Sequence, residues 1–398
     1  MYHTLVINVD ELWLKGKNRP MYYRALRGHI RELLKARHKE PFTCVNEEQR
    51  IVARSESPFS EETIQAFLNV PGIHSIIPAR RIPVDFQHIF PTVKEELQRL
   101  EGLPPTFKVE TRRSYKGFPM DSMEVCSEIG TLVLKEFPRL VVDLENPGLI
   151  IEIRILEKNI YISTRKLLGV GGLPVGTSGH LVSLLSGGFD SPVASFLMSK
   201  RGCRQTFIFF YAYPFVGDEV KDKVLKLVRI LGRYQRYSRL YVVPFGEVQN
   251  LISGNCQASY RTLLFRKAML QCSTLLARKI KADALLTGDA LGQVSSQTIG
   301  NISVLDRVSP LTIFRPLLGY NKIEIIALAK KIGTHDISVI PHDDACSLFA
   351  AKHPVIRPSA SYLEKFDKEV QLEGPLNKCL QEAEIYEISV TGGLTRIN

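Results

Sequence analysis

Residues 180–192 read HLVSLLSGGFDSP, and this stretch decides the fold of the C-terminal half of the chain. The apolar run 180–185 predicts a buried strand. Pro192 suits the first turn of a helix, which the pattern extends from 191 to 201. Further strands are expected at 204–213, 238–245 and 282–288, alternating with helices at 218–234, 260–280 and 322–332. Because apolar strands that alternate with helices favour a parallel sheet covered on both faces, residues 180–398 are expected to form an α/β parallel-sheet domain.

The loop SGGFDS, which starts at Ser186, has the composition of an anion-binding turn. Gly187 and Gly188 let the backbone approach an anion, and the hydroxyl of Ser191 adds a donor beside that of Ser186. Asp190 repels phosphate but suits Mg²⁺. No Gly-Lys-Ser/Thr follows the glycines, so the loop is not a Walker A loop. The glycine pattern of dinucleotide-binding folds is also absent. An ordinary glycine turn between strand and helix is the alternative.

The N-terminal half has a different pattern. A strand at 2–9, a basic amphipathic helix at 18–38 and two short strands near 42–54 predict a small α+β unit, residues 1–57. Asn18 is the expected N-cap of the helix, and Pro20 lies in its first turn.

A second α+β unit is expected at 58–168. Its helices are predicted at 60–70, 88–101 and 121–137, its strands at 73–85 and 106–113, and its closing hairpin at 149–156 and 159–166. The segment GVGGLPVGTSG at 169–179 is the expected linker to the α/β domain. Residues 375–398 carry no pattern that assigns them an element.

The charge of the chain is unevenly distributed. The formal net charge is +11, but residues 1–40 carry an excess of five positive charges and residues 196–281 an excess of twelve, so the remainder is acidic. A focal excess of this kind favours a polyanionic partner, with a merely solvated basic surface as the alternative. Arg24 and Arg27, on the solvent-facing side of the N-terminal helix, are therefore candidate contacts to such a polyanion.

Composition excludes several classes of protein. Hydrophobic residues make up 44% and charged residues 23% of the 398, which are ordinary globular values. The longest apolar stretch, 206–216, is too short to cross a membrane and contains Pro214. The N-terminus does not resemble a secretory signal, and seven scattered cysteines favour a reducing cytoplasm, so a cytoplasmic protein with no membrane partner is expected.

Three further segments carry residues suited to chemistry. In FKVETRRSYKGF, at 107–118, a strand presents Arg112, Arg113 and Lys116 with Tyr115 and Phe118 interleaved, which would offer charges to phosphates and rings to unpaired bases. An arginine-rich strand edge that discourages aggregation is the alternative.

The second segment, LTGDALGQVSSQT at 286–298, follows a strand, and Gly288 and Gln297 lie where parallel sheets bind ligands. The third, PHDDACSLF at 341–349, contains Cys346 in a polar loop flanked by His342, although two aspartates oppose a thiolate there and an inert cysteine is the alternative.

The loop SGGFDS resembles the signature of the PP-loop ATP pyrophosphatases, which split ATP between its α- and β-phosphates. Phe107 to Gly130 resembles a THUMP domain, which binds tRNA. Together with LGQVSSQT and the late Cys346, the chain resembles the tRNA 4-thiouridine synthase family (tRNA uracil 4-sulfurtransferases) over nearly its whole length. The resemblance implies a ferredoxin-like domain at 1–57, a THUMP domain at 58–168 and a PP-loop ATP pyrophosphatase domain at 180–398.

The resemblance also implies a reaction and its residues. In that family ATP adenylates the C4 oxygen of the uridine at tRNA position 8, a sulfur nucleophile displaces AMP, and the product is 4-thiouridine. The implied ATP-binding residues are Leu184, Leu185, Ser186, Gly187, Gly188, Ser191, Phe209, Phe210, Arg266, Gly288 and Gln297. Asp190 is implied as a catalytic and Mg²⁺-binding residue, and Cys346 as the reactive cysteine. Taken alone, Arg266 lies on a helix where it could equally bridge to solvent.

Departures from the family pattern shape the remaining expectations. Many members add a rhodanese-like domain with a second catalytic cysteine, and this chain ends too soon after Cys346 to hold one. Sulfide or a persulfide-carrying protein is then the expected sulfur donor, with Cys203, placed near the loop, as a candidate partner thiol or else a buried residue. No C-x-x-C occurs, so no iron–sulfur cluster is expected. Asp289 stands where Glu is commoner in the family.

The expected partners are tRNA and a second copy of the chain. Part of the family also supplies sulfur for the thiazole of thiamine, which no residue here tests. Two rival functions stay open: a lysidine-type synthase, which adenylates a base but uses an amine, and a tRNA-binding protein that holds nucleotide without reaction. The loop aspartate, Asp190, argues against the second rival because binding alone does not require it.

Overall fold

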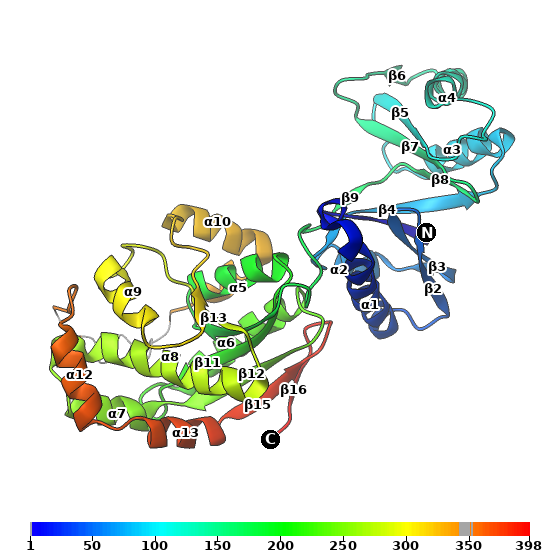
Figure 1. Ribbon diagram of the computed structural model, residues 1–398. Coiled ribbons are helices and arrows are strands. Elements are labelled where there is room, and N and C mark those ends of the chain that lie inside the picture. The colour runs from blue at the N-terminus through cyan, green and yellow to red at the C-terminus, as the bar shows by residue number, and fades with distance from the viewer. Residues whose placement is uncertain (1, 342–350, 352) are drawn as a thin grey trace. The chain divides into compact units, whose positions relative to one another are not determined.

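The computed structural model describes residues 2–341, 351 and 353–398, which form two compact units (Figure 1). Unit 1 comprises residues 1–69 and 73–171, and unit 2 comprises residues 70–72 and 172–398. The division falls inside the predicted linker, where Gly171 and Gly172 have φ angles of +69° and +81° that favour glycine. Leu173 then donates its N–H to the carbonyl of Lys200 at 2.9 Å, so the end of the linker is built into unit 2.

Unit 1 is an α+β structure around one nine-stranded sheet, in the order β2-β3-β1-β4-β8-β7-β5-β6 with β9 paired to β4. Its strands are β1 (Tyr2–Val9), β2 (Phe42–Glu47), β3 (Arg50–Phe59), β4 (Ile73–Ile82), β5 (Thr106–Arg113), β6 (Val141–Val142), β7 (Leu149–Ile155), β8 (Ile160–Ser163) and β9 (Leu167–Leu168). Its helices are α1 (Arg19–Arg37), α2 (Glu61–Phe67), α3 (Ile89–Gln98) and α4 (Ser122–Glu136). The predicted hairpin is confirmed as β7 and β8, which pair antiparallel.

The sheet of unit 1 is continuous through both predicted N-terminal domains. The boundary that we expected between residues 57 and 58 falls inside β3, and β1 pairs with both β3 and β4. Helices α3 and α4 pack on β5, β7 and β8 around a core that includes Val93, Phe107 and Ile129. The expected N-cap differs in detail: Asn18 occupies the position but makes no side-chain cap bond, because the 3₁₀ turn Leu12–Asn18 leads straight into α1.

Unit 2 has a seven-stranded sheet in the order β14-β13-β10-β11-β12-β15-β16, and its first five strands are parallel as predicted. The strands are β10 (His180–Leu185), β11 (Arg204–Tyr211), β12 (Ser238–Pro244), β13 (Ala284–Leu286), β14 (Thr312–Phe314), β15 (Glu384–Ile388) and β16 (Leu394–Arg396). The helices are α5 (Asp190–Lys200), α6 (Asp218–Gly232), α7 (Gly246–Gly254), α8 (Arg261–Ile280), α9 (Ile299–Asp306), α10 (Lys322–Ile332), α11 (His335–Ser338), α12 (Ala360–Glu369) and α13 (Glu373–Gln381). Helices α7, α8 and α13 cover one face and α5 and α6 the other (Figure 1).

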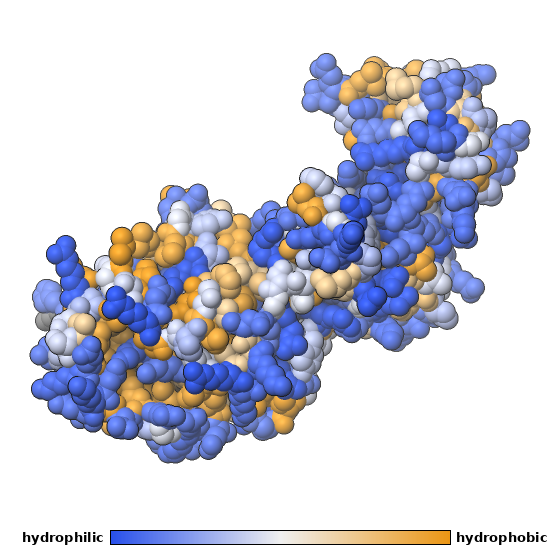
Figure 2. Space-filling view, in the orientation of Figure 1, coloured by the Kyte–Doolittle hydropathy of each residue, from blue (hydrophilic) through white to orange (hydrophobic). Residues whose placement is uncertain are grey.

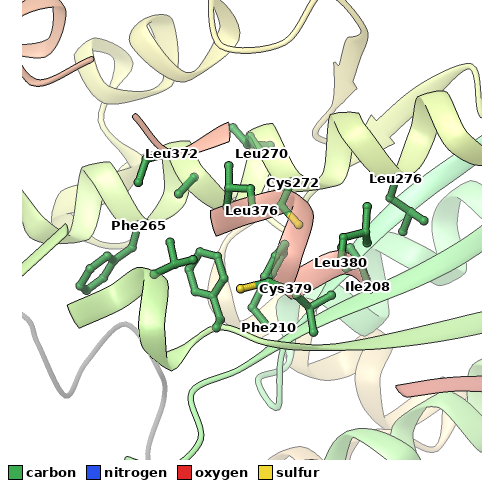
Figure 3. Close-up of a cluster of buried hydrophobic side chains, with 14 of the residues drawn as sticks. Ile208, Phe210, Phe265, Leu270, Cys272, Leu276, Leu372, Leu376, Cys379 and Leu380 are labelled. Atoms are coloured by element: carbon green, nitrogen blue, oxygen red, sulfur yellow. The ribbon is translucent and has the colours of Figure 1, made fainter. Parts of the chain in front are cut away.

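The residues that the sequence left unassigned close one edge of this sheet. Strand β15 pairs antiparallel with β12, and β16 pairs antiparallel with β15. Helix α13 packs on α8, where Leu376, Cys379 and Leu380 meet Phe265 and Cys272 in the main core of the unit (Figure 3). The short edge strands are held by this packing rather than by a strong pattern of their own, which is why their sequence carries no clear signal.

Candidate active site

The predicted phosphate loop lies between β10 and α5, at the carboxyl edge of the parallel sheet. The Ser186 N–H donates to Ser191 Oγ at 2.9 Å, and the Gly188 N–H donates to Ser186 Oγ at 3.4 Å. Ser338, in α11, donates its hydroxyl to the Gly188 carbonyl at 3.1 Å. The two loop serines therefore hold the turn in shape at the N-terminus of α5, where backbone N–H groups and the helix dipole favour an anion.

Asp190 is the first residue of α5, and two side chains from distant parts of unit 2 meet its carboxylate. Lys322 Nζ lies 2.7 Å from Oδ1, and Gln293 Nε2 donates to Oδ2 at 2.8 Å. The Lys322 ammonium also lies 5.3 Å from the centre of the Phe189 ring. Sequence reasoning missed Lys322 and Gln293. The signal for Lys322 was its place as first residue of α10, since a lysine is electrostatically disfavoured at a helix N-terminus.

Asp289 is the centre of a buried group of charges at the ends of β13 and β14. It pairs with Arg266 from α8, and Arg315 Nε donates to its Oδ2 at 3.1 Å. The Thr287 hydroxyl donates to the same oxygen at 2.8 Å. Burial opposes ionisation of Asp289, but Arg266, the Thr287 hydroxyl and Arg315 together hold the pKa of its carboxyl below the usual range. The Asp289 carboxylate is therefore charged, and both of its oxygens accept hydrogen bonds from these partners. Sequence reasoning missed Arg315.

Gly288 and Gln297 lie beside this group, as the predicted site requires. A Cβ at Gly288 would come within 2.6 Å of the backbone nitrogen of Ser191, so only glycine lets the end of β13 pack against the start of α5. Gln297 Nε2 lies 3.5 Å from Asp289 Oδ1, and Arg266 donates to the Ser296 carbonyl at 2.7 Å. The two predicted ATP segments, SGGFDS and LGQVSSQT, thus meet at one edge of the sheet.

The four apolar residues predicted to line the adenosine pocket divide between the two faces of the sheet. Leu185 and Phe209 belong to the core under α6, whereas Leu184 and Phe210 pack on the α8 side. Phe210 lies within that core (Figure 3). It is 5% exposed, and its ring meets the ring of Phe245 edge-on. Because successive residues of a strand point to opposite faces, the Phe209 and Phe210 side chains cannot form one wall, and a shared contact with adenosine would involve their backbone.

The cysteines differ in their suitability for chemistry. Cys346 lies outside the described residues. The expectation that Cys203 lies near the phosphate loop is wrong, because it follows the C-terminus of α5, an 11-residue helix whose other end carries the loop and which is about 16 Å long. Its thiol is 3% exposed, and burial raises its pKa to about 11. Burial likewise raises the pKa of Cys272 to about 12 and of Cys379 to about 11.

A single carboxylate at the loop limits what kind of metal the site fits. Within the described residues, no group of three or more His, Cys, Asp or Glu side chains is placed to hold a metal ion. Asp190 alone suits Mg²⁺ that is bound mainly by the phosphates of a nucleotide, since Mg²⁺ commonly takes one or two carboxylates and several phosphate or water oxygens.

Unit 1 contains a basic cavity of about 320 Å³ on its sheet. Its lining includes the cations Arg19, Arg50, Arg112, Arg154 and Lys166, one carboxylate, Asp10, and the aromatic side chains of Trp13 and Tyr23. Arg154 is only 3% exposed and is held by Glu152 and by Asn8. Trp13, the single tryptophan of the chain, is 69% exposed beside the cavity. Clustered cations beside one exposed aromatic ring, that of Trp13, are suited to nucleic acid, whereas Tyr23 is buried.

The other predicted tRNA contacts are distributed around unit 1. Lys116 is exposed, whereas Arg113 donates to the Phe118 carbonyl at 2.9 Å and so also holds the loop. The expectation that Phe118 faces bases is wrong, because its side chain is 3% exposed in the core. Tyr115 is half-buried and packs partly against the same core, so its contact with bases stays a prediction.

On α1, Arg24 is exposed and Arg27 half-buried. Neither lines the basic cavity.

Two further features of unit 2 lie outside this site. The cavity between α8 and the α12–α13 segment, about 470 Å³, contains none of the predicted site residues. Exposed apolar side chains gather around α9 and α10 (Figure 2); they include Leu291, Val294, Ile299, Leu318 and Ile323. In the part of the chain that the structure describes, no helix is long and apolar enough to cross a membrane.

Models of three families match successive parts of the chain. Residues 4–76 match the ThiI ferredoxin-like domain, residues 84–165 match the THUMP domain, and residues 176–372 match the family described as thiamine biosynthesis protein (ThiI).

Similar proteins are found among sequences and solved structures. A probable tRNA sulfurtransferase of Halothermothrix orenii is 39% identical over 98% of this chain and 99% of its own, and one of Acetivibrio thermocellus is 36% identical over 98% and 100%. The crystal structure of a 4-thiouridine synthetase–RNA complex with bound ATP is 30% identical, with a TM-score of 0.87 over 97% of this chain and all of that one. PH1313 from Pyrococcus horikoshii, at 24% identity and a TM-score of 0.63, shares the fold.

Proposed function

Since the chain belongs to the ThiI family of tRNA sulfurtransferases, we propose that it converts uridine 8 of tRNA to 4-thiouridine in two steps, adenylation of the C4 oxygen by ATP and displacement of AMP by sulfur. The observation that carries the proposal is the meeting of Asp190, Lys322 and Gln293 at the phosphate loop. A structural or purely binding role does not require a carboxylate and an ammonium at that point.

Adenylation needs charge stabilisation at the leaving pyrophosphate. The C4 oxygen attacks the α-phosphorus, and the bond to the β-phosphate oxygen breaks. The loop amides at the N-terminus of α5 and the Lys322 ammonium are the chain's own groups for the growing negative charge. Mg²⁺ bound to the nucleotide with Asp190 would supply further neutralisation. Arg266 and Gln297, joined through Asp289, are placed to contact the nucleotide at the end of β13.

The sulfur step uses the adenylate as a leaving group. A sulfur nucleophile adds to C4 and AMP departs with the former C4 oxygen, which a uracil carbonyl alone would not release. Cys346 is the cysteine proposed for this step from its match to the reactive cysteine of the family. The thiols of Cys203, Cys272 and Cys379 suit the step poorly, because burial raises their pKa values. Sulfide or a persulfide-carrying protein is the proposed donor.

The basic cavity of unit 1 is the proposed contact for the tRNA backbone. Arg154 is buried against Glu152, but the other four cations of the cavity still outnumber its one carboxylate, so phosphates can replace counterions there. The family relationship and the RNA complex of the 30% identical synthetase support tRNA as the substrate, rather than another polyanion.

Thiolation is tested with the purified chain, ATP, Mg²⁺, sulfide and unmodified tRNA. We expect pyrophosphate release and 4-thiouridine by mass spectrometry, and chelation of Mg²⁺ should abolish both. Release without any thiolated product would favour an amine-using, lysidine-type reaction, whereas tRNA binding without release would favour the non-catalytic rival.

Cys346→Ser tests the role of the cysteine in the sulfur step. With a persulfide donor, this variant should lose 4-thiouridine formation by about a thousandfold while its tRNA and ATP affinities stay within about twofold. Cys126→Ser, which changes a half-buried thiol in unit 1, is the matched control. Normal thiolation by Cys346→Ser would remove the cysteine from the mechanism.

A further inference from the structure

Arg315 is a buried arginine next to the nucleotide site that neither the sequence pattern nor the proposed chemistry uses. It directly follows β14, and its side chain is 6% exposed. Strand β14 pairs in parallel with β13, whose end leads to Asp289, so the two residues lie side by side at the carboxyl edge of the sheet. A buried guanidinium is costly unless its charge is compensated, which makes its partners the clue to its role.

The guanidinium of Arg315 joins two carboxylates. Its Nε donates to Asp289 Oδ2 at 3.1 Å, and its Nη1 donates to Asp306 Oδ1 at 2.6 Å. Asp306 is half-exposed at the end of α9, whereas Asp289 is 4% exposed. Arg315 therefore ties the buried carboxylate to the surface of α9 and fixes its orientation.

The two oxygens of Asp289 have separate partners. Oδ2 accepts from Arg315 and Thr287, while Oδ1 accepts from Arg266. Because Arg315 and Thr287 hold Oδ2, the carboxylate keeps one orientation, and Oδ1 points toward α8. There it accepts from the Arg266 guanidinium and so positions it.

Arg266 passes the constraint to the second ATP segment. Its other Nη donates to the Ser296 carbonyl at 2.7 Å, and Gln297 is the next residue of that turn. Buried ion pairs of this kind are costly to desolvate and often add little net stability, so we attribute their presence at the proposed site to their fixed geometry.

We propose that Arg315 is a positioning residue for ATP: through Asp289 it holds Arg266, and with it the turn that carries Gln297, in the arrangement that receives the nucleotide. The inference rests on the proposed function. The rival is direct contact, because Arg315 Nη2 is buried and has no acceptor among the described residues. In the rival, Nη2 itself binds an anionic group of ATP.

A double-mutant cycle on the full chain separates these two roles. The dissociation constant of ATP with Mg²⁺ is measured by equilibrium dialysis without tRNA for the wild type, Arg315→Met, Arg266→Met and the double variant. We expect ATP to bind about tenfold more weakly to Arg315→Met, and the double variant to match Arg266→Met within about twofold. The positioning role would be overturned if the loss of ATP affinity in the double variant equalled the product of the two single losses. An ATP affinity unchanged in Arg315→Met would overturn it as well.

Three controls keep the outcome readable. Arg278→Met removes a cation from an exposed position of α8 and should leave ATP affinity unchanged. Arg315→Lys keeps the charge but not the fork that reaches two carboxylates, so it should recover part of the affinity and, in the Arg266→Met background, again add nothing. Circular dichroism melts establish that each variant is folded at the assay temperature. If Arg315→Met is not folded, Arg315→Lys is used in its place in the double-mutant cycle.

The proposed function and this inference fail in different ways. A wild-type chain that does not bind ATP would contradict the proposed function. A wild-type chain that binds ATP, with Arg315→Met equal to it, would contradict only the role of Arg315.

Discussion

The proposed nucleotide site of unit 2 and the basic cavity of unit 1 both contain several cations, but they hold them differently. In unit 2, Lys322 pairs with Asp190, and Arg266 and Arg315 share Asp289. In unit 1, five cations line a cavity with a single carboxylate in its wall. Each cation at the unit 2 site is paired with a carboxylate, whereas the unit 1 cavity still has more cations than carboxylates after Arg154 pairs with Glu152 and Arg50 with Glu48.

The difference corresponds to two uses of charge. A leaving pyrophosphate is stabilised by donors that are already in place, because a preorganised site need not reorganise during the reaction. A polyanion is bound instead by many weak contacts that release counterions, which needs excess charge more than exact geometry. We therefore expect substitutions in unit 2 to change rate and substitutions in unit 1 to change tRNA affinity.

The largest effect is expected for Lys322→Met. Loss of the ammonium removes charge stabilisation at the phosphate loop and leaves Asp190 without its cation, so pyrophosphate release should slow by about 10²–10³-fold. The tRNA affinity should stay within about twofold. Lys330→Met, which removes an exposed lysine from the same helix, is the control. A rate within threefold of the wild type would show that Lys322 serves only the fold.

An intermediate effect is expected for the pH dependence of stability. Burial, and then the charge of Arg204, lower the pKa of His180 to about 4. A histidine with a lowered pKa stabilises the fold above its unfolded pKa of about 6.5 and loses that contribution as the pH falls toward 4. Between pH 7.5 and 5 the free energy of unfolding should fall by about 2 kcal/mol from this residue.

Urea unfolding of the wild type and of His180→Gln at both pH values checks this prediction. The glutamine variant does not titrate, so its loss of stability between pH 7.5 and 5 should be smaller by that amount. Equal losses in the two proteins would mean that His180 is not the group that responds.

The smallest effect is expected for Arg112→Met in the basic cavity. Removing one of several phosphate contacts should weaken tRNA binding by about fivefold and reduce the slope of log affinity against log salt by about one. Quenching of Trp13, the single tryptophan and a neighbour of the cavity, reports the binding. Arg139→Met, an exposed arginine outside the cavity, is the control. Equal losses in the two variants would point to general charge rather than to the cavity.

Much of the fold was predictable because its signals are local. The apolar run of β10, the glycine loop and the start of α5 follow one another within residues 180–192, and the alternation after them predicts the parallel sheet. The same holds for the hairpin of β7 and β8. Strands β15 and β16 were not predictable, since their place depends on pairing with β12 and on the packing of α13 over α8.

The site divides along the same line. Ser186 to Ser191 carry their chemistry in their spacing, and Arg266, Gly288 and Gln297 followed from the family resemblance. Lys322 lies 132 residues from its partner Asp190, so the pair is invisible until β13, β14 and α10 bring it together. Cys203 shows the reverse error, because it is close to the loop in sequence but lies beyond the far end of α5.

Sequence was sufficient for the class of fold, the phosphate loop and the family, because each depends on contiguous residues whose backbone preferences and side chains act locally. Folding determines which distant charges become partners: Lys322 with Asp190, and Arg315 with Asp289. The physical reason is that a buried charge is stable only beside its compensating group, and parallel strands bring such groups together at one edge of the sheet from positions far apart in the chain.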